Sequence, residues 1–389
     1  MPRPNHDPPQ APAVVMYVIA GLACGGAEMV LLELVRGLDR QRFRPVVASL
    51  QAPAVLSEQF RAAGVDVHHF HMRSVAQAPL VVARVATLAR RLRPGLLHGV
   101  MFYGDIVCRA LRPMLPGVSV VGALHSTHIG PAAWVTLLRM TDPMVDAVTA
   151  VSDVVADTHR ALRTTTDAKL VVIPNGVDER RFARPNEAEL ARARRKMRLD
   201  SRKIVLTVGR LEREKNFELL LNAFALLRSL DLGLVVVGDG SLRSNLEREA
   251  RRLGVAGRVR FLGHVDPVNP FLHIADVFAM SSDIEGLPLV MLEAMAAGTP
   301  LVLTEVGGIP DVVEHEKTAL LVPPGDAPAL AAAIQRAVNM SEAERNRLTD
   351  AARGVFRDRF SVRRMVEDTE SLYSRLLQGS ASAVGLRSG

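Results

Sequence analysis

Residues 204–240 have the sequence IVLTVGRLEREKNFELLLNAFALLRSLDLGLVVVGDG, in which one helical segment separates two short apolar runs. The runs Ile204–Val208 and Leu232–Val237 are rich in β-branched residues and apolar at consecutive positions, which is typical of strands buried on both faces. Residues Glu218–Ser229 between them have the apolar spacing of a helix. This order of elements predicts a parallel sheet covered by helices on both sides.

The same alternation extends over most of the chain. In the first half we expect strands at Val14–Ala20, Pro45–Leu50, Val65–Phe70, Gly95–Val100, Val118–Leu124, Ala147–Val151 and Leu170–Ile173. In the second half we expect them at Ile204–Val208, Leu232–Val237, Arg258–Phe261, Val277–Met280, Pro300–Leu303 and Ala319–Val322. The predicted fold class is therefore α/β, with two doubly wound parallel sheets in tandem and a ligand cleft between the carboxyl ends of their strands.

Shifts in composition suggest where the domains begin and end. Residues 1–12 are rich in proline and polar residues and residues 379–389 in Gly and Ser, so we expect two disordered tails. Between them we expect a first domain at 13–178, a charge-dense linker or edge helix at 179–202, a second domain at 203–358 and a final helix at 359–378.

Composition excludes several classes of protein. The formal net charge is +7, but 43 of the 48 basic residues are Arg and they are scattered along the chain. Because aromatic residues make up only 4%, platforms of stacked rings for single-stranded nucleic acid are not expected. A diffuse basic surface instead favours anionic ligands or anionic lipid headgroups.

The cysteines and the N-terminus point to the cytoplasm. Cys24 and Cys108 are too few for a disulfide framework or a CxxC metal site. The apolar run Val14–Cys24 resembles an export signal, but few basic residues precede it and cleavage would remove the first strand. No apolar run is long enough to span a membrane, so we expect a cytoplasmic protein that is soluble or peripheral.

Glycine-rich turns follow three of the expected strands. Gly25 and Gly26 open a helix after the first strand, where the backbone can approach an anion and the helix N-terminus offers free N–H groups. A tight strand-to-helix turn is the alternative, because the GxGxxG spacing of dinucleotide sites is absent. Gly209 and Gly238 end the two strands of residues 204–240 at the same predicted edge.

Two cations follow Gly209. Arg210 and Lys215 lie in a loop at a strand end, where a planar guanidinium and a mobile ammonium suit a diphosphate. Ion pairs with Glu212 and Glu214 are the alternative.

The strongest motif is Glu285-Gly-Leu-Pro-Leu-Val-Met-Leu-Glu293-Ala-Met-Ala-Ala-Gly298-Thr-Pro300. If helical rise separates the two carboxylates, they lie about 12 Å apart and cannot share a proton or a metal. They could instead hold the two ends of an elongated ligand by its hydroxyls. Glu293 lies in an apolar helix, so we expect it to have a hydrogen-bonding partner.

Together these motifs resemble the retaining family 4 glycosyltransferases, whose GT-B fold consists of two Rossmann-like domains facing each other across a cleft. The resemblance covers about residues 14–340. Besides the paired glutamates it rests on Gly25-Gly26-Ala27-Glu28, His125, Pro174-Asn-Gly-Val-Asp178, Gly209-Arg210 with Lys215, Gly238-Asp-Gly240, Gly263, Gly307-Gly308 and Pro324-Gly-Asp326.

The resemblance implies roles for individual residues. Arg210 and Lys215 match the pair that neutralises the donor diphosphate, and Glu285 matches the carboxylate that contacts the donor sugar. Glu293 matches the carboxylate that holds the nucleotide ribose, and His125 matches the histidine beside the transferred sugar. The other donor-binding residues implied are Gly25, Gly26, Gly209, Gly238, Gly286 and Leu287. The final helix is expected to pack on the N-terminal domain.

The expected reaction is transfer of a sugar from a UDP-, GDP- or ADP-sugar to an acceptor hydroxyl in bacterial cell-surface polysaccharide or glycolipid synthesis. No suitably placed DxD motif is present, so we expect neither a metal nor another cofactor. Fixed cations would stabilise the departing diphosphate, which would take the acceptor proton during front-face attack. A covalent intermediate on Glu285 is the rival mechanism.

Other readings and partners stay open. A sugar-nucleotide epimerase, an inverting transferase and a non-catalytic nucleotide-sugar-binding subunit are the alternative functions. The acceptor site is expected near residues 68–80 and 125–140, and no nucleic-acid partner is expected. The basic residues that could dock the N-terminal half on an anionic membrane are Arg84, Arg90, Arg91, Arg93, Arg109 and Arg112.

Overall fold

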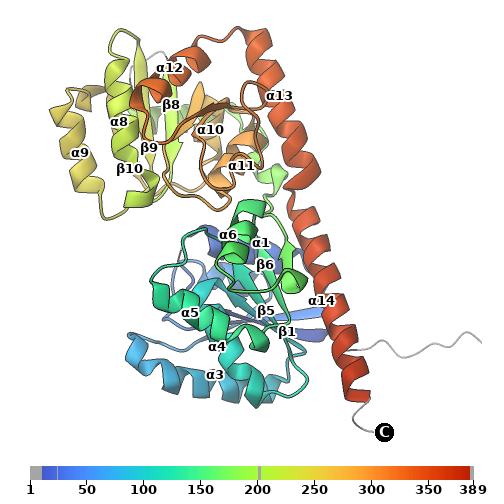
Figure 1. Ribbon diagram of the computed structural model, residues 1–389. Coiled ribbons are helices and arrows are strands. Elements are labelled where there is room, and N and C mark those ends of the chain that lie inside the picture. The colour runs from blue at the N-terminus through green and yellow to red at the C-terminus, as the bar shows by residue number, and fades with distance from the viewer. Residues whose placement is uncertain (1–10, 24, 200–202, 386–389) are drawn as a thin grey trace, which may run out of the picture.

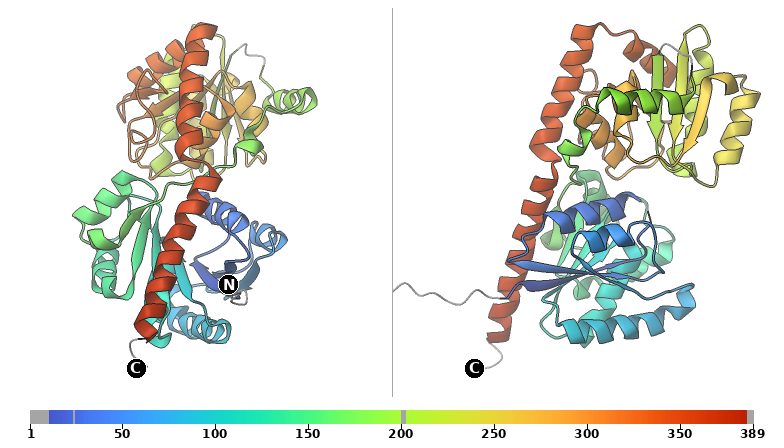
Figure 2. Two further views of the ribbon diagram at one scale, coloured as in Figure 1. Left: turned by 90° about the vertical axis from the view of Figure 1, so that its right-hand side faces the viewer. Right: turned by 180° about the vertical axis from the view of Figure 1, so that it is seen from behind.

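The structure, a computed structural model, describes residues 11–23, 25–199 and 203–385. Two α/β domains lie one above the other, and the last two helices run along one side of both (Figure 1). Figure 2 shows from two further sides that the last helix extends down the N-terminal domain. Residues 1–10 and 386–389 of the expected tails lie outside the described residues, as does Cys24.

Seven strands form a fully parallel sheet in the N-terminal domain. Their order is β3-β2-β1-β4-β5-β6-β7, so the winding direction reverses between β1 and β4. The strands are β1 Ala13–Ile19, β2 Phe43–Ser49, β3 Asp66–His69, β4 Leu96–Val100, β5 Ser119–Leu124, β6 Ala147–Ala150 and β7 Leu170–Val172. The helices are α1 Gly26–Gly37, α2 Ser57–Ala62, α3 Ala78–Leu92, α4 Met101–Leu111, α5 Ala132–Met140 and α6 Asp153–Ala161.

The C-terminal domain repeats this plan with six parallel strands. Their order is β10-β9-β8-β11-β12-β13, with the reversal between β8 and β11. The strands are β8 Lys203–Val208, β9 Leu232–Val237, β10 Val259–Gly263, β11 Val277–Met280, β12 Leu301–Thr304 and β13 Leu320–Val322. The helices are α7 Glu187–Met197, α8 Phe217–Leu226, α9 Arg243–Arg252, α10 Asn269–Ile274, α11 Leu289–Ala297, α12 Ala327–Val338 and α13 Glu342–Arg359. The last helix of the chain, α14 Val362–Gly385, packs on the N-terminal domain.

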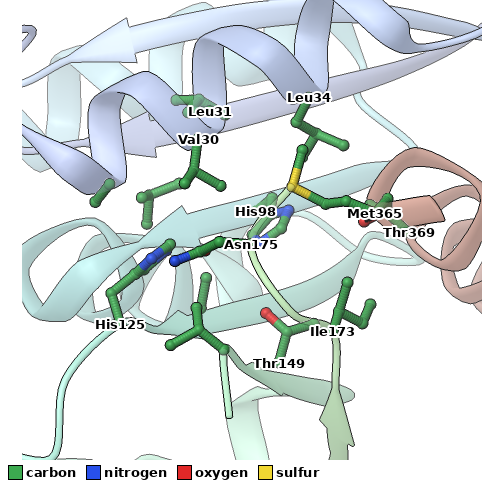
Figure 3. Close-up of a pocket in the computed structure, with 14 residues that line it drawn as sticks. Val30, Leu31, Leu34, His98, His125, Thr149, Ile173, Asn175, Met365 and Thr369 are labelled. Carbon is green, nitrogen blue, oxygen red and sulfur yellow. Dashed lines mark hydrogen bonds between the residues drawn. The ribbon is translucent and has the colours of Figure 1, made fainter. Parts of the chain in front are cut away.

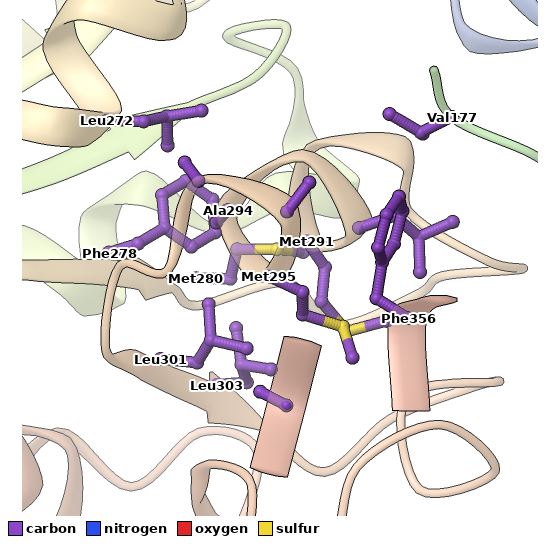
Figure 4. Packing of buried hydrophobic residues seen from close by; sticks show 14 of the residues in the cluster. Val177, Leu272, Phe278, Met280, Met291, Ala294, Met295, Leu301, Leu303 and Phe356 are labelled. Carbon is purple, nitrogen blue, oxygen red and sulfur yellow. The ribbon is translucent and has the colours of Figure 1, made fainter. Parts of the chain in front are cut away.

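Helix α11 is buried in the core of the C-terminal domain. Helix α11 packs between Phe278 of β11 and Phe356 of α13 through Met291, Ala294 and Met295 (Figure 4). Its small residues allow this close packing, and Gly298 ends the helix with φ at +75°, a conformation that glycine adopts without a steric penalty. The buried helix gives the loop in front of it, residues 285–288, a rigid base.

Helix α14 belongs to the core of the other domain. Met365, Val366 and Tyr373 are buried against α1 and the N-terminal sheet. The chain therefore crosses between the domains twice, after β7 and after α13, on the side that α14 covers.

The predicted fold of two doubly wound parallel sheets is confirmed, with every expected strand present. Helix α7 fits the expected edge helix: Ala193 and Met197 are buried in the C-terminal core, while its charged side chains are exposed. One detail differs. Helix α14 continues to Gly385, so residues 379–385 are helical where a tail was expected. Helix α14 also contains many polar and charged residues. Its apolar side chains share one face, which is typical of a helix that packs on a domain.

Candidate active site

The carboxyl end of each sheet carries loops that meet between the domains. The Ser152 hydroxyl donates to the carbonyl of Gly286 over 3.3 Å, and the Asn175 amide donates to the carbonyl of Leu287 over 3.1 Å. A β-carbon at Gly286 would overlap the carbonyl oxygen of His125. The 285–288 loop is therefore in direct contact with the N-terminal domain, and only glycine fits at its second position.

Two glycines of the C-terminal domain, Gly307 and Gly308, contact this loop from the other side. A β-carbon at Gly307 would overlap the carbonyl oxygen of Glu285, and Gly307 has φ at +54°. The N–H of Gly308 donates to the carbonyl of Gly286 over 3.0 Å. The loop is thus packed backbone against backbone on both sides.

Lys215 and Glu285 form an ion pair at the carboxyl ends of β8 and β11. Lys215 Nζ lies 2.6 Å from Glu285 Oε1, and the Ser282 hydroxyl donates to the same oxygen over 2.7 Å. The side chains are 20% and 7% exposed. Lys215 ends the 3₁₀ turn Arg213–Lys215, and Asn216, at φ +43°, caps α8 directly after it. The ammonium group is thereby held at the carboxyl end of the sheet and stays partly exposed.

Arg210 lies opposite a carboxyl group of the N-terminal domain. Its side chain is 66% exposed and pairs with Glu214 over 3.0 Å, one of the two partners expected from sequence. Burial raises the pKa of Glu28 in the first turn of α1, while the positive charge of Arg210 lowers it. Sequence reasoning did not single out Glu28 as a site residue, although Gly25-Gly26-Ala27-Glu28 contained it.

The glycine turns predicted after β1, β8 and β9 differ in how much room they leave for a ligand. A β-carbon at Gly238, which has φ at +131°, would overlap the carbonyl of Gly209, so these turns pack on each other. At Gly26, which is exposed, a β-carbon would meet only Leu289, at 3.8 Å. The space in front of Gly26 therefore allows a ligand to approach the N-terminus of α1. Gly25, in contrast, is covered by the carboxyl of Glu28.

The structure corrects two expectations for Glu293. It is the fifth residue of α11, and residues 285–288 are loop, so the separation of the two glutamates is not eight residues of helical rise. Within the described residues the half-buried Glu293 side chain forms no hydrogen bond and no ion pair. Burial raises its pKa to about 7, Arg181 lowers it and Asp266 raises it further.

His125 follows β5 and lines a cavity beneath α1 (Figure 3). Burial lowers its pKa to about 4, so the imidazole is neutral at physiological pH. A neutral ring can donate or accept one hydrogen bond beside a ligand without adding charge.

Within residues 11–23, 25–199 and 203–385, no three His, Cys, Asp or Glu side chains are grouped closely enough to hold a metal ion. Helices of the length and hydropathy needed to cross a bilayer do not occur in that part of the chain either.

Comparisons with known proteins agree with this architecture. The family model described as "Glycosyltransferase Family 4" matches residues 24–181, and the one described as "Glycosyl transferases group 1" matches residues 191–355. The solved structure of Anabaena HepE in complex with UDP-glucose has a TM-score of 0.83 at 22% identity, covering 93% of this chain and 99% of that chain. At this identity the likeness concerns the fold.

Two curated relatives extend the match to sequence. A GDP-mannose-dependent alpha-(1-6)-phosphatidylinositol monomannoside mannosyltransferase of Mycobacterium tuberculosis is 36% identical over 281 residues, 67% of this chain and 71% of that enzyme. N-acetyl-alpha-D-glucosaminyl L-malate synthase of Bacillus anthracis is 28% identical over 306 residues, 77% of this chain and 79% of that enzyme. With its two parallel sheets and these matches, the chain belongs to the family 4 glycosyltransferases, enzymes of the GT-B fold.

Proposed function

We propose that this glycosyltransferase moves a sugar from a nucleoside-diphosphate sugar to an acceptor hydroxyl, with retention of configuration and without a metal. The Lys215–Glu285 pair at the cleft is the observation that carries the proposal. The solved relative HepE binds UDP-glucose, and the mycobacterial relative is named for GDP-mannose, which supports this donor class.

The charges fit the departure of a diphosphate. Lys215 and the exposed Arg210 lie at the carboxyl end of β8, opposite the open N-terminus of α1 at Gly26. Fixed cations stabilise the negative charge that develops as the sugar–phosphate bond breaks. The leaving phosphate then takes the proton of the attacking hydroxyl.

Glu285 is better suited to orient the sugar than to attack it. One of its oxygens accepts hydrogen bonds from both Lys215 and Ser282, which reduces its nucleophilicity. Its other oxygen, which forms no hydrogen bond among the described residues, can accept from a sugar hydroxyl. This arrangement favours front-face attack over a covalent intermediate.

For the acceptor, we propose a lipid-linked molecule with an anionic head group, reached at the inner face of a bacterial membrane during polysaccharide or glycolipid synthesis. Segments 70–84, 101–104 and 125–141 follow β3, β4 and β5 and contain no Asp or Glu. They carry the exposed apolar side chains Val75, Leu80, Met101, Tyr103, Leu137 and Met140. They also carry Arg73, Arg84 and Arg139, which form no ion pair within the described residues.

The structure corrects two of the basic residues expected from sequence, while Arg84 belongs to both surfaces. Arg109 is buried in a 2.8 Å ion pair with Asp105, and Arg112 pairs with Asp146, so neither is free to bind lipid. Phe102 and Trp134 instead stack at 4.0 Å between ring centroids on the same side of the domain. A combination of apolar and basic groups without acidic ones fits an anionic amphiphile.

A panel of UDP-, GDP- and ADP-sugars, scored for release of the free nucleoside diphosphate, tests the donor. Hydrolysis of one donor that is lost in Lys215→Met supports the proposal, and hydrolysis that survives this substitution contradicts it. Proton NMR of the first product decides between retention and inversion at the anomeric carbon.

Liposomes test the acceptor surface. Sedimentation with anionic vesicles should fall in the double variant Leu137→Ser, Met140→Ser and stay unchanged in Leu226→Ser, an exposed leucine of α8 in the other domain. Equal binding by all three proteins, or no binding by any, would contradict a lipid-linked acceptor at this surface.

A further inference from the structure

A small cavity lies in the N-terminal domain between α1, the carboxyl ends of β4 and β5, and α14 (Figure 3). Its volume is about 50 Å³. Most of its wall is apolar, formed by side chains such as Val30, Leu34 and Ile173. His98 and Asn175 both line it, and each has a buried polar atom, Nε2 and Oδ1, without a hydrogen-bonding partner within the described residues.

His98 presents a hydrogen-bond acceptor to this cavity. The Tyr373 hydroxyl of α14 donates to the Tyr17 hydroxyl over 3.0 Å, so the Tyr373 oxygen is free to accept from His98 Nδ1, 2.5 Å away. With the proton on Nδ1, Nε2 carries a lone pair. Burial lowers the pKa of His98 to about 3, so the ring does not gain a second proton near neutral pH.

Asn175 presents a second acceptor. Its Nδ2 donates to the carbonyl of Leu287 over 3.1 Å, which fixes the orientation of the amide and directs Oδ1 away from that bond. Both His98 and Asn175 are about 95% buried, at 5% exposure each. Neither atom can bond to the other, because both are acceptors.

We propose that the cavity binds a water molecule that donates one O–H to His98 Nε2 and the other to Asn175 Oδ1. A neutral molecule with two donors satisfies both atoms, whereas a cation would be poorly solvated by the apolar wall. The volume is sufficient for water, and buried water commonly bridges polar groups that the protein leaves unpaired.

The bound water completes a hydrogen-bond chain between the N-terminal domain and the 285–288 loop. The chain runs from Tyr17 and Tyr373 through His98, the water and Asn175 to the carbonyl of Leu287. It joins α14 and the N-terminal sheet to the 285–288 loop, which carries Glu285. If the proposed function holds, His98 and Asn175 are positioning residues for donor binding, while the water site itself is independent of that function.

A high-resolution crystal structure of the full chain tests the water directly. We expect one ordered peak within hydrogen-bond distance of His98 Nε2 and Asn175 Oδ1. A dry cavity, another occupant, or a direct contact between the two side chains would overturn the proposal.

Amide hydrogen exchange tests the coupling without requiring activity. Exchange of residues 286–291 should rise several-fold in both Asn175→Leu and His98→Leu. It should not change in Thr369→Val, which alters the same cavity wall but leaves the chain intact. A rise in Asn175→Leu alone would show that the 285–288 loop depends only on the direct bond to Leu287, and would overturn the link through His98.

Discussion

Lys215 Nζ and Glu285 Oε1 lie 2.6 Å apart, although 70 residues separate them in the chain. Each comes from a loop after a central strand of the C-terminal sheet, β8 for Lys215 and β11 for Glu285. Because β8 and β11 are neighbours at the point where the winding reverses, the fold itself brings the two charges together.

We predict that Lys215→Met lowers the rate of donor cleavage by about 10²- to 10³-fold, which is the usual loss when one preorganised donor to a developing anion is removed. Nucleoside diphosphate release measures this. Arg213→Ala is the matched control, because it removes an exposed positive charge from the same 3₁₀ turn. Equal losses in both variants would indicate a general effect of charge and would remove Lys215 from its proposed role.

A β-carbon at Gly286 should disturb the contact between the domains. Overpacking of this kind costs about 1–3 kcal/mol, so Gly286→Ala should slow turnover about 10- to 100-fold if the contact with His125 forms in the reacting enzyme. Gly354→Ala in α13 is the control, since its β-carbon would meet no atom within 4 Å. Unchanged turnover in Gly286→Ala would show that this contact is not needed for reaction.

Periodicity and turn chemistry were sufficient to predict both sheets. Each apolar β-branched run predicts its strand from local sequence alone, without knowledge of the strands it pairs with. Glycines at the strand ends mark the turns that follow. The sequence left open whether α7 is a linker or an edge helix, because Ala193 and Met197 are its only buried residues among many charged ones.

Pairings between distant residues were beyond sequence reasoning. Nothing local to Lys215 distinguishes Glu285 from the nearer Glu212 and Glu214 as its partner. The same applies to Glu293, where an apolar helix suggested a paired carboxylate and the structure has an unpaired one with a raised pKa. Such features depend on which loops converge, and that is determined by the topology of the whole sheet.

The pH profile of the enzyme should contain no step from His125. Its pKa is lowered to about 4, so the ring stays neutral from pH 5 to pH 8. We expect His125→Gln to lower kcat by a factor that is constant over this range. His315→Gln, an exposed histidine of the C-terminal domain, should leave kcat unchanged. A loss that appears only below pH 7 would mean that His125 acts in its charged form.

Glu293 should make stability depend on pH near neutrality. Its pKa is about 7 in the folded protein against an ordinary value of 4.5, so the folded chain holds this proton more tightly than the unfolded chain does. The resulting stability is fully present below about pH 4.5 and is lost as the pH rises through about 7. The loss is on the order of 3 kcal/mol, because one pKa unit corresponds to about 1.36 kcal/mol.

Glu293→Gln should therefore unfold at higher denaturant concentration than the wild-type protein at pH 8, with a smaller difference at pH 5. Glu305→Gln, an exposed glutamate of the same domain, should match the wild type at both values. A saturating nucleotide sugar should reverse the order at pH 8, because ribose hydroxyls donate to the ionised carboxylate and lower its pKa. If the donor stabilises Glu293→Gln as strongly as the wild type, Glu293 does not contact the ribose.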